Sequence, residues 1–271
     1  MDKILLAHWV GEFGYELFGF QSIMRSLSKQ FDKTIIVSRP LNEALYKDFA
    51  EFIPHIPSTN ITNFATCRDD KPFNYSKIKH THLIPAQTNL VHWHPRKGFF
   101  HWNDKYLLGA RHEFIKFGHP AEELRYDIIF HCRATSKNGS GGKNWSPTNY
   151  LKIAEKFKHL RMASIGTQNE SSCIDHTEDL RGIGLQKLMD IMSSSQMFVG
   201  GSSGPAHLAS LCGLPHITWG ISIIEKRYLE SWNPFQTPVI FRPYWHPEVD
   251  EIEKLIKIFM GIKRVEPPKS K

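Results

Sequence analysis

The stretch that decides the fold is QMFVGGSSGPAHLASLCGLPHITWG, which runs from Gln196 to Gly220. Its apolar beginning ends in the pair Gly200–Gly201, as a buried parallel strand does before a turn. Pro205 suits the first turn of a helix, which we expect to end near Gly213. A second strand, His216–Trp219, follows that helix. Strand, glycine turn, helix and strand are parts of a βαβ unit, and they predict an α/β fold with a parallel sheet.

The turn in this unit also predicts a phosphate site. The backbone N–H groups of Ser203, Gly204 and Ala206 would lie at the positive end of the helix dipole, at the carboxyl edge of the sheet. Open α/β sheets bind their ligands at that edge. A plain glycine-rich turn that binds nothing explains these residues equally well.

The first part of the chain predicts another parallel sheet. We expect a strand over Lys3–Trp9, a helix over Tyr15–Lys29, a strand over Thr34–Ser38 and a helix over Asn42–Phe52. Alternating strands and helices connect in a right-handed sense. Further elements are expected as strands at Ile61–Phe64 and His82–Ile84 and a helix over Asp104–Phe117.

A second α/β unit begins with the strand Ile128–Arg133, and Ser146 with Pro147 can cap the helix that follows. Residues 1–122 and 123–271 are therefore expected to form two Rossmann-like domains. The remaining predicted elements are a strand over Arg161–Ile165, a loop over Ser171–Gly184, and helices over Leu185–Ser195 and from Val249 to Phe259.

Composition narrows the class of protein. A hydrophobic content of 41% supports a folded core, and no apolar run approaches the roughly 20 residues of a membrane span. The four cysteines lack CxxC spacing and the N-terminus has too short an apolar run for a signal peptide, so we expect reduced thiols and a cytoplasmic location. The formal charge of +7 suits a polyanionic partner or an anionic membrane surface, or else is a basic surface without specific duty.

The phosphate turn resembles that of the ADP-heptose:lipopolysaccharide heptosyltransferase superfamily, whose pattern is Asp-Ser-Gly-Pro-x-His-x-Ala. Five residues match, and Ser202 stands where the family usually has Asp; the matches are Ser203, Gly204, Pro205, His207 and Ala209. The resemblance implies the glycosyltransferase B (GT-B) fold in a compact form, with two Rossmann-like domains facing across a cleft. It also implies that Ser202, Ser203, Gly204, Pro205 and His207 belong to a donor site.

The same resemblance assigns further donor-binding residues. Arg133 ends a strand and Lys143 opens a Lys-x-Trp run before a helix, as in the family segment that neutralises the donor diphosphate. The run EDLRG, which begins at Glu178, matches an acidic-Leu-Arg-Gly run of the family. A carboxylate there, Glu178, could reach a ribose hydroxyl.

Glu12 aligns with the catalytic carboxylate of the family, which follows a glycine just beyond the first strand. Glu16 is a competitor one helical turn further on. The alternative is that either carboxylate merely favours the helix N-terminus by its charge.

The family implies an inverting glycosyltransferase that uses a nucleotide-sugar as cosubstrate, with no metal and no other cofactor. The expected acceptor is a surface glycan or lipopolysaccharide. One alternative is a bacteriophage-type transferase acting on DNA bases, because the segment HWHPRKGFFHW, residues 92–102, mixes basic and aromatic side chains in a predicted loop. A second alternative is a binding module of the same fold without turnover, which the Ser202 substitution favours.

Overall fold

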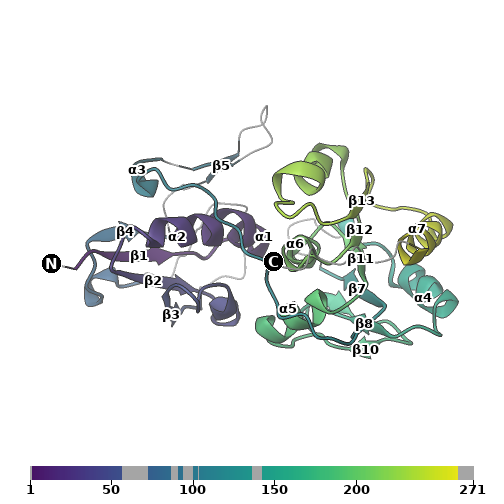
Figure 1. Cartoon of the computed structure of the whole chain (residues 1–271). Helices are drawn as coiled ribbons and strands as arrows, with labels where there is room; N and C mark the ends of the chain where they lie inside the picture. The colour runs from purple at the N-terminus through teal and green to yellow at the C-terminus, as the bar shows by residue number, and fades with distance from the viewer. Residues whose placement is uncertain are drawn as a thin grey trace, which may run out of the picture.

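The computed structural model describes residues 2–56, 73–86, 91–93, 100–102, 104–135 and 142–261. Two sheets organise the chain, one in each half (Figure 1). The purple and blue elements at the left belong to the first half, and the teal, green and yellow elements at the right belong to the second. The expected α/β class is therefore confirmed.

The first sheet is parallel and has the strand order β3-β2-β1-β4. All five residues of β1 are buried, because neighbours cover both faces of this strand. The strands are β1 (Ile4–His8), β2 (Lys33–Ser38), β3 (Glu51–Pro54) and β4 (His82–Ile84).

The helix expected after the first strand is present but is not uniformly α-helical. It consists of α1 (Phe13–Tyr15), the π-helical segment η1 (Glu16–Phe20) and α2 (Gln21–Ser28). The N–H of Gln21 bonds the carbonyl of Glu16, five residues earlier. Such wide turns are rare and frequently lie at functional sites.

The predicted helix over Asn42–Phe52 is wrong. The chain instead forms the 3₁₀-helix η2 (Pro40–Leu45), a turn, and the edge strand β3. β3 pairs in parallel with β2, from Ile35 opposite Glu51 to Ser38 opposite Pro54. Tertiary pairing has overridden the local helical pattern.

The helix expected over Asp104–Phe117 is also wrong beyond its first turn. Helix α3 spans Asp104–Leu107 and ends where Leu108 and Gly109 take positive φ values of 46° and 78°. The chain then runs to the second half, where the N–H of Phe117 donates to the carbonyl of Leu211.

Two other predictions concern the middle of the chain. The strand expected at Ile61–Phe64 lies outside the described residues. In the expected loop over residues 92–102, the described parts form the antiparallel strands β5 (Val91–Trp93) and β6 (Phe100–Trp102). A short 3₁₀-helix, η3 (Tyr75–Lys77), precedes β4.

The second sheet has the order β10-β8-β7-β11-β12-β13, and all pairs along this path are parallel. The short strand β9 pairs antiparallel with β7. The predicted loop over Ser171–Gly184 thus contains two short strands, β9 and β10. The strands are β7 (Ile128–Arg133), β8 (Met162–Ser164), β9 (Ser171–Ser172), β10 (Glu178–Asp179), β11 (Met197–Gly201), β12 (His216–Trp219) and β13 (Val239–Arg242).

The helices of the second half begin where the sequence predicts, whereas the helix expected over Leu185–Ser195 ends at Ser193 and the last helix continues to Gly261. The Ser146 side chain accepts a hydrogen bond from the N–H of Thr148, and Gly213 ends its helix at φ 68°. The helices are α4 (Pro147–Lys156), α5 (Leu185–Ser193), α6 (Gly204–Cys212) and α7 (Val249–Gly261), with the short η5 (Ser222–Ile224) and η6 (Arg227–Ser231) after β12.

The two halves touch through α1 and α6 (Figure 1) and also through η2 and α5. Phe18 stacks on Trp232 with ring centroids 5.0 Å apart, and Tyr15 meets the same indole edge-on at 5.5 Å. One apolar cluster includes buried residues of both halves. A domain boundary at 122–123 remains a prediction. Within the described ranges, no helix has the length and apolarity that a bilayer span requires.

Candidate active site

The carboxyl edge of the second sheet brings Arg133 next to the phosphate turn. Strands β7 and β11 are parallel neighbours, so their last residues, Arg133 and Gly201, lie at the same edge. Helix α6 begins three residues after Gly201, at Gly204. The first-turn N–H groups of a helix have no partner within it, so this turn presents donors beside a guanidinium group.

Three hydrogen bonds fix the serines that precede α6. The Ser203 hydroxyl lies 3.0 Å from Nδ1 of His131 and donates to the carbonyl of Gly201. The hydroxyl of Tyr228 donates to Oγ of Ser202 at 2.9 Å. Burial, together with the charge of Arg133, lowers the pKa of His131 to about 4, so this imidazole is neutral near pH 7. The turn is therefore held by neutral groups.

His207 is buried in the contact between the two halves. Its ring stacks on Tyr228 at 4.5 Å and meets Trp232 edge-on at 4.6 Å. Burial, Arg227 and His216 lower its pKa well below the usual value. A Cβ atom added at Gly14 would lie 3.1 Å from this ring. These contacts favour a packing role under the turn for His207.

Arg133 is half-buried and has two carboxylates within electrostatic reach. Burial lowers the pKa of Arg133, whereas Glu170 and Glu12 raise it. Glu170 belongs to the second half, and its carbonyl accepts the N–H of Ala134. Glu12 belongs to the first half. The Glu12 carboxylate, from the first half, therefore acts electrostatically on Arg133, from the second half.

Lys143 is exposed and lies beside the same edge. Its Nζ sits 5.6 Å from the ring centre of Trp245. The next residue, Asn144, accepts a hydrogen bond from Nη1 of Arg133 at 3.2 Å and donates to the carbonyl of Thr135. Asn144 therefore links the segment that carries Lys143 to Arg133.

The two candidate catalytic carboxylates have different environments. Glu12 is exposed, and its extended backbone (φ −66°, ψ 145°) precedes the first turn of α1. Glu16 is fully buried and accepts hydrogen bonds of 2.6 Å from Ser38, Asn42 and Tyr46. Burial raises the pKa of Glu16 to about 7 although these three donors and Arg39 lower it. An accessible carboxylate can meet a substrate, so Glu12 is the better candidate for a base.

Glu178 lies away from these residues. In the sheet register it is level with Ala163 and, through it, with Ile129. Ile129 is four positions before Arg133, which is roughly 13 Å of strand. Glu178 accepts a hydrogen bond of 2.6 Å from the Tyr126 hydroxyl. The structure does not bring Glu178 together with the other site residues.

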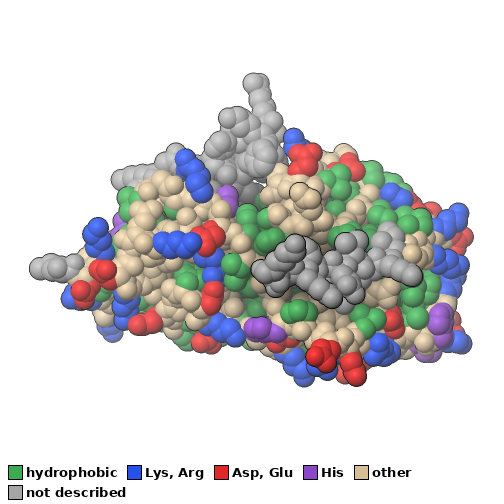
Figure 2. All heavy atoms as spheres, viewed as in Figure 1, with side chains coloured by type: hydrophobic (Ala, Val, Ile, Leu, Met, Phe, Trp, Pro, Cys, Tyr) green, Lys and Arg blue, Asp and Glu red, His purple; other side chains and the backbone are tan. Residues whose placement is uncertain are grey.

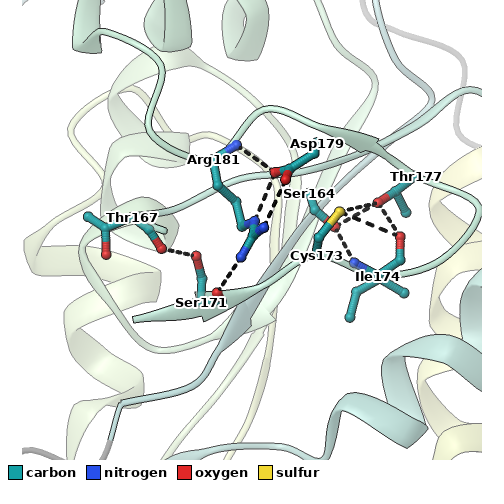
Figure 3. Close-up of polar contacts among 8 residues, drawn as sticks. All are labelled: Ser164, Thr167, Ser171, Cys173, Ile174, Thr177, Asp179 and Arg181. Atoms are coloured by element: carbon teal, nitrogen blue, oxygen red, sulfur yellow. Dashed lines mark hydrogen bonds and ion pairs between the residues drawn. The ribbon is translucent and has the colours of Figure 1, made fainter. Parts of the chain in front are cut away.

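The run EDLRG, residues 178–182, holds the short strand β9 in place through the side chain of Arg181. Figure 3 shows the Arg181 side chain reaching both Asp179 and Ser171. Its guanidinium donates two hydrogen bonds of 2.8 Å to the Asp179 carboxylate and one to the Ser171 carbonyl. Arg181 lowers the pKa of Asp179 to about 2. Because Ser171 pairs with Arg133 across β9 and β7, this brace supports the strand beside the site.

Sequence reasoning missed His131 and Glu170. His131 lies two residues before Arg133 in one strand, so alternation alone places both side chains on one face. Glu170 follows the strand that ends near Ile165, and carboxyl ends of neighbouring parallel strands share an edge. The match of EDLRG to the family pattern led to the prediction of Glu178 as the donor-site carboxylate instead.

Phe13, which follows Glu12, packs against the start of α6. A Cβ atom added at Gly204 would lie 2.7 Å from Cδ1 of Phe13. Gly204→Ala is therefore expected to lower the free energy of unfolding by roughly 1–3 kcal/mol, as overpacking does. Chemical denaturation measures this. Gly261→Ala is the control, since an added Cβ there meets nothing within 4 Å; an equal loss in both variants would contradict the contact.

No family model matches this sequence, and no curated protein matches it. The fold is similar to that of E. coli ADP-heptose LPS heptosyltransferase II, with a TM-score of 0.60 and 12% identity over 95% of this chain and 98% of that one. The glycosyl transferase family 9 structure from Veillonella parvula DSM 2008 gives 0.53 at 12% identity, over 99% of this chain and 92% of that one.

E. coli heptosyltransferase WaaC, solved with ADP, gives a TM-score of 0.50 at 11% identity, over 94% of this chain and 99% of that one. At such identities these likenesses concern the fold. They confirm the resemblance at that level, and they confirm the α/β class with two Rossmann-like halves of the GT-B type.

Proposed function

We propose that this chain is a glycosyltransferase that moves a sugar from a nucleoside-diphosphate sugar to a hydroxyl group of an acceptor. The observation that carries the proposal is that Phe13, the residue after Glu12, packs against Gly204 at the start of α6, so the turn that carries Glu12 in the first half adjoins the anion-binding edge of the second. The Glu12 carboxylate also acts electrostatically on Arg133. A base and an anion-binding edge on opposite sides of one reacting centre are what this chemistry needs. The GT-B fold of the structural neighbours supports the assignment.

In the proposed reaction, the Glu12 carboxylate takes the proton of the acceptor hydroxyl. The hydroxyl oxygen bonds the anomeric carbon while the bond from that carbon to the diphosphate breaks. The electron pair leaves with the diphosphate, and attack from the opposite side inverts the anomeric centre. Arg133, Lys143 and the first-turn N–H groups of α6 stabilise the charge that grows on the leaving group. Because these groups supply positive charge, we propose that the step needs no metal ion.

The carboxylate that we now assign to the donor side is Glu170, because the residue after it, Ser171, pairs with Arg133 and the Glu170 charge acts on that guanidinium. For the acceptor we propose a glycan of the cell surface. On one face of the molecule, Figure 2 shows the Lys and Arg side chains of the described residues dispersed among acidic ones.

A donor screen tests the proposal. The protein is incubated with ADP-, UDP-, GDP- and dTDP-sugars, and mass spectrometry follows the release of the nucleoside diphosphate with and without lipooligosaccharide or duplex DNA. We expect release from one donor class, stimulated by the glycan. If no donor is consumed and calorimetry detects no nucleoside diphosphate binding, the proposed function is wrong.

Lys143→Ala is expected to weaken binding of the preferred nucleoside diphosphate by about 10- to 100-fold. The reason is that one charge-assisted contact contributes roughly 1.5–3 kcal/mol. Calorimetry measures the affinity. Lys152→Ala removes an exposed lysine from α4 and serves as the control. Equal affinity in the Lys143 variant and the wild type would remove this lysine from the site.

A further inference from the structure

The turn that carries Glu12 is fastened to the neighbouring strand. β1 and β2 are parallel neighbours with His8 opposite Val37, so the residues after each strand meet at one edge. Arg39 is the first residue after β2. The turn that follows β1 leads directly to Glu12, and the N–H of Trp9 donates to the carbonyl of Val37.

The Arg39 guanidinium bonds two consecutive carbonyl groups of this turn. Nη1 donates to Gly11 at 2.6 Å, and Nη2 donates to Val10 at 2.7 Å. Hydrogen bonds from an ionised donor are stronger than those between neutral groups, and a planar fork with two bonds also fixes orientation. The backbone directly before Glu12 is thereby held in one position.

A second anchor lies after Glu12. The buried Glu16 carboxylate accepts hydrogen bonds from Ser38, Asn42 and Tyr46, all in or just after β2. The N–H of Glu16 in turn donates to the carbonyl of Glu12 at 3.0 Å. The exposed Glu12 thus sits between two attachments to the same neighbouring segment.

The turn also has little room to move inward. The ring of Trp9 is fully buried beneath it, and a Cβ atom added at Gly11 would lie 2.5 Å from that ring. A residue with a side chain at position 11 could not fit here without displacing the indole ring of Trp9. The tryptophan below and the guanidinium beside it define one conformation for the turn.

We propose that Arg39 is a positioning residue that holds the Glu12 carboxylate at the reacting centre. This inference rests on the proposed function. The Arg39 guanidinium bonds the turn before Glu12, so its effect on the reaction passes through Glu12. A misplacement of about 1 Å in a reacting group can lower the rate by about 100-fold.

The test compares the wild type with Arg39→Ala and Arg39→Lys. In Arg39→Ala we expect kcat to fall by about 10- to 100-fold, while KM for the nucleotide-sugar and affinity for ADP stay within about twofold. Added guanidinium ion, at concentrations that do not unfold the protein, should restore part of the turnover. Arg39→Lys keeps the charge but cannot form the fork, and its kcat should lie between the two.

Arg25→Ala is the matched control. Arg25 is a buried arginine of the same half whose guanidinium bonds Asp48 and the carbonyl of Leu45 instead of the Glu12 turn. Its removal tests whether losing any buried arginine has the same effect. We expect its kcat to stay near that of the wild type and to show no rescue by guanidinium.

Hydrogen exchange of residues 10–16 supplies a readout that is independent of turnover. Faster exchange in Arg39→Ala, with wild-type exchange in Arg25→Ala, supports the clamp. Unchanged exchange together with unchanged kcat overturns it. If the wild type consumes no nucleotide-sugar, the proposed function fails by that result, and exchange alone decides whether Arg39 holds the turn.

Discussion

Glu12→Gln is expected to lower sugar transfer by about 10²- to 10⁴-fold, the usual contribution of a general base. Glutamine keeps the size of the side chain but cannot accept the proton of the acceptor hydroxyl. Affinity for the nucleoside diphosphate should not fall. The negative charge of Glu12 offsets the positive charge of Arg133 and repels a bound anion, so its removal does not weaken binding of the diphosphate. The release of nucleoside diphosphate, followed by mass spectrometry, measures turnover, and calorimetry measures affinity.

Glu43→Gln is the control for this variant. Glu43 is an exposed carboxylate of the same half, on η2, and its change should leave both quantities near the wild-type values. Wild-type turnover in Glu12→Gln would move the base to another carboxylate. A parallel loss of turnover and ADP affinity would instead place Glu12 in the donor site.

The second large effect concerns Glu16 and the pH dependence of stability. Burial raises the pKa of Glu16 from about 4.5 to about 7 in the folded protein. The folded state therefore binds this proton more tightly than the unfolded state does. The stabilisation is fully present below pH 4.5 and is lost as the pH rises through 7.

Two buried histidines, His131 and His216, change the stability with pH in the direction opposite to Glu16. Burial lowers the pKa of His131 and of His216 from 6.5 to about 4, so the stability they contribute is present above pH 6.5 and is lost as the pH falls through 4. The wild-type profile is the sum of both effects. The contribution of Glu16 is therefore measured as the difference in unfolding free energy between the wild type and a Glu16 variant.

Glu16→Gln should become more stable relative to the wild type by roughly 2–3 kcal/mol between about pH 5 and pH 8. Urea unfolding at several pH values measures this difference. A constant difference across that range would show that the Glu16 pKa is not raised. Glu43→Gln is again the control, because an exposed carboxylate should give a flat difference.

Local chemistry explains what the sequence predicted well. In residues 196–220, the glycine pair, Pro205 and Gly213 each specify a backbone conformation within a few residues, and the strand, turn and helix follow. Arg133 likewise stands at the end of β7, after five buried residues.

The missed features depend on contacts between distant segments. β3 exists because β2 pairs with it, which no pattern within residues 42–54 indicates. Glu170 reaches Arg133 because β9 returns antiparallel along β7. The different burial of Glu12 and Glu16, four residues apart, follows from η2 covering one carboxylate and leaving the other accessible.

The stacked rings of Phe18 and Trp232 have a consequence for work with fragments of this chain. Each ring is covered by the other half, so cutting the chain in the segment between α3 and β7 would expose both faces to water. Fragments produced in this way should associate or precipitate, and co-expressing them should restore a folded pair. The activity regained when the two fragments are mixed would then measure how strongly the contact between Phe18 and Trp232 holds the two halves together.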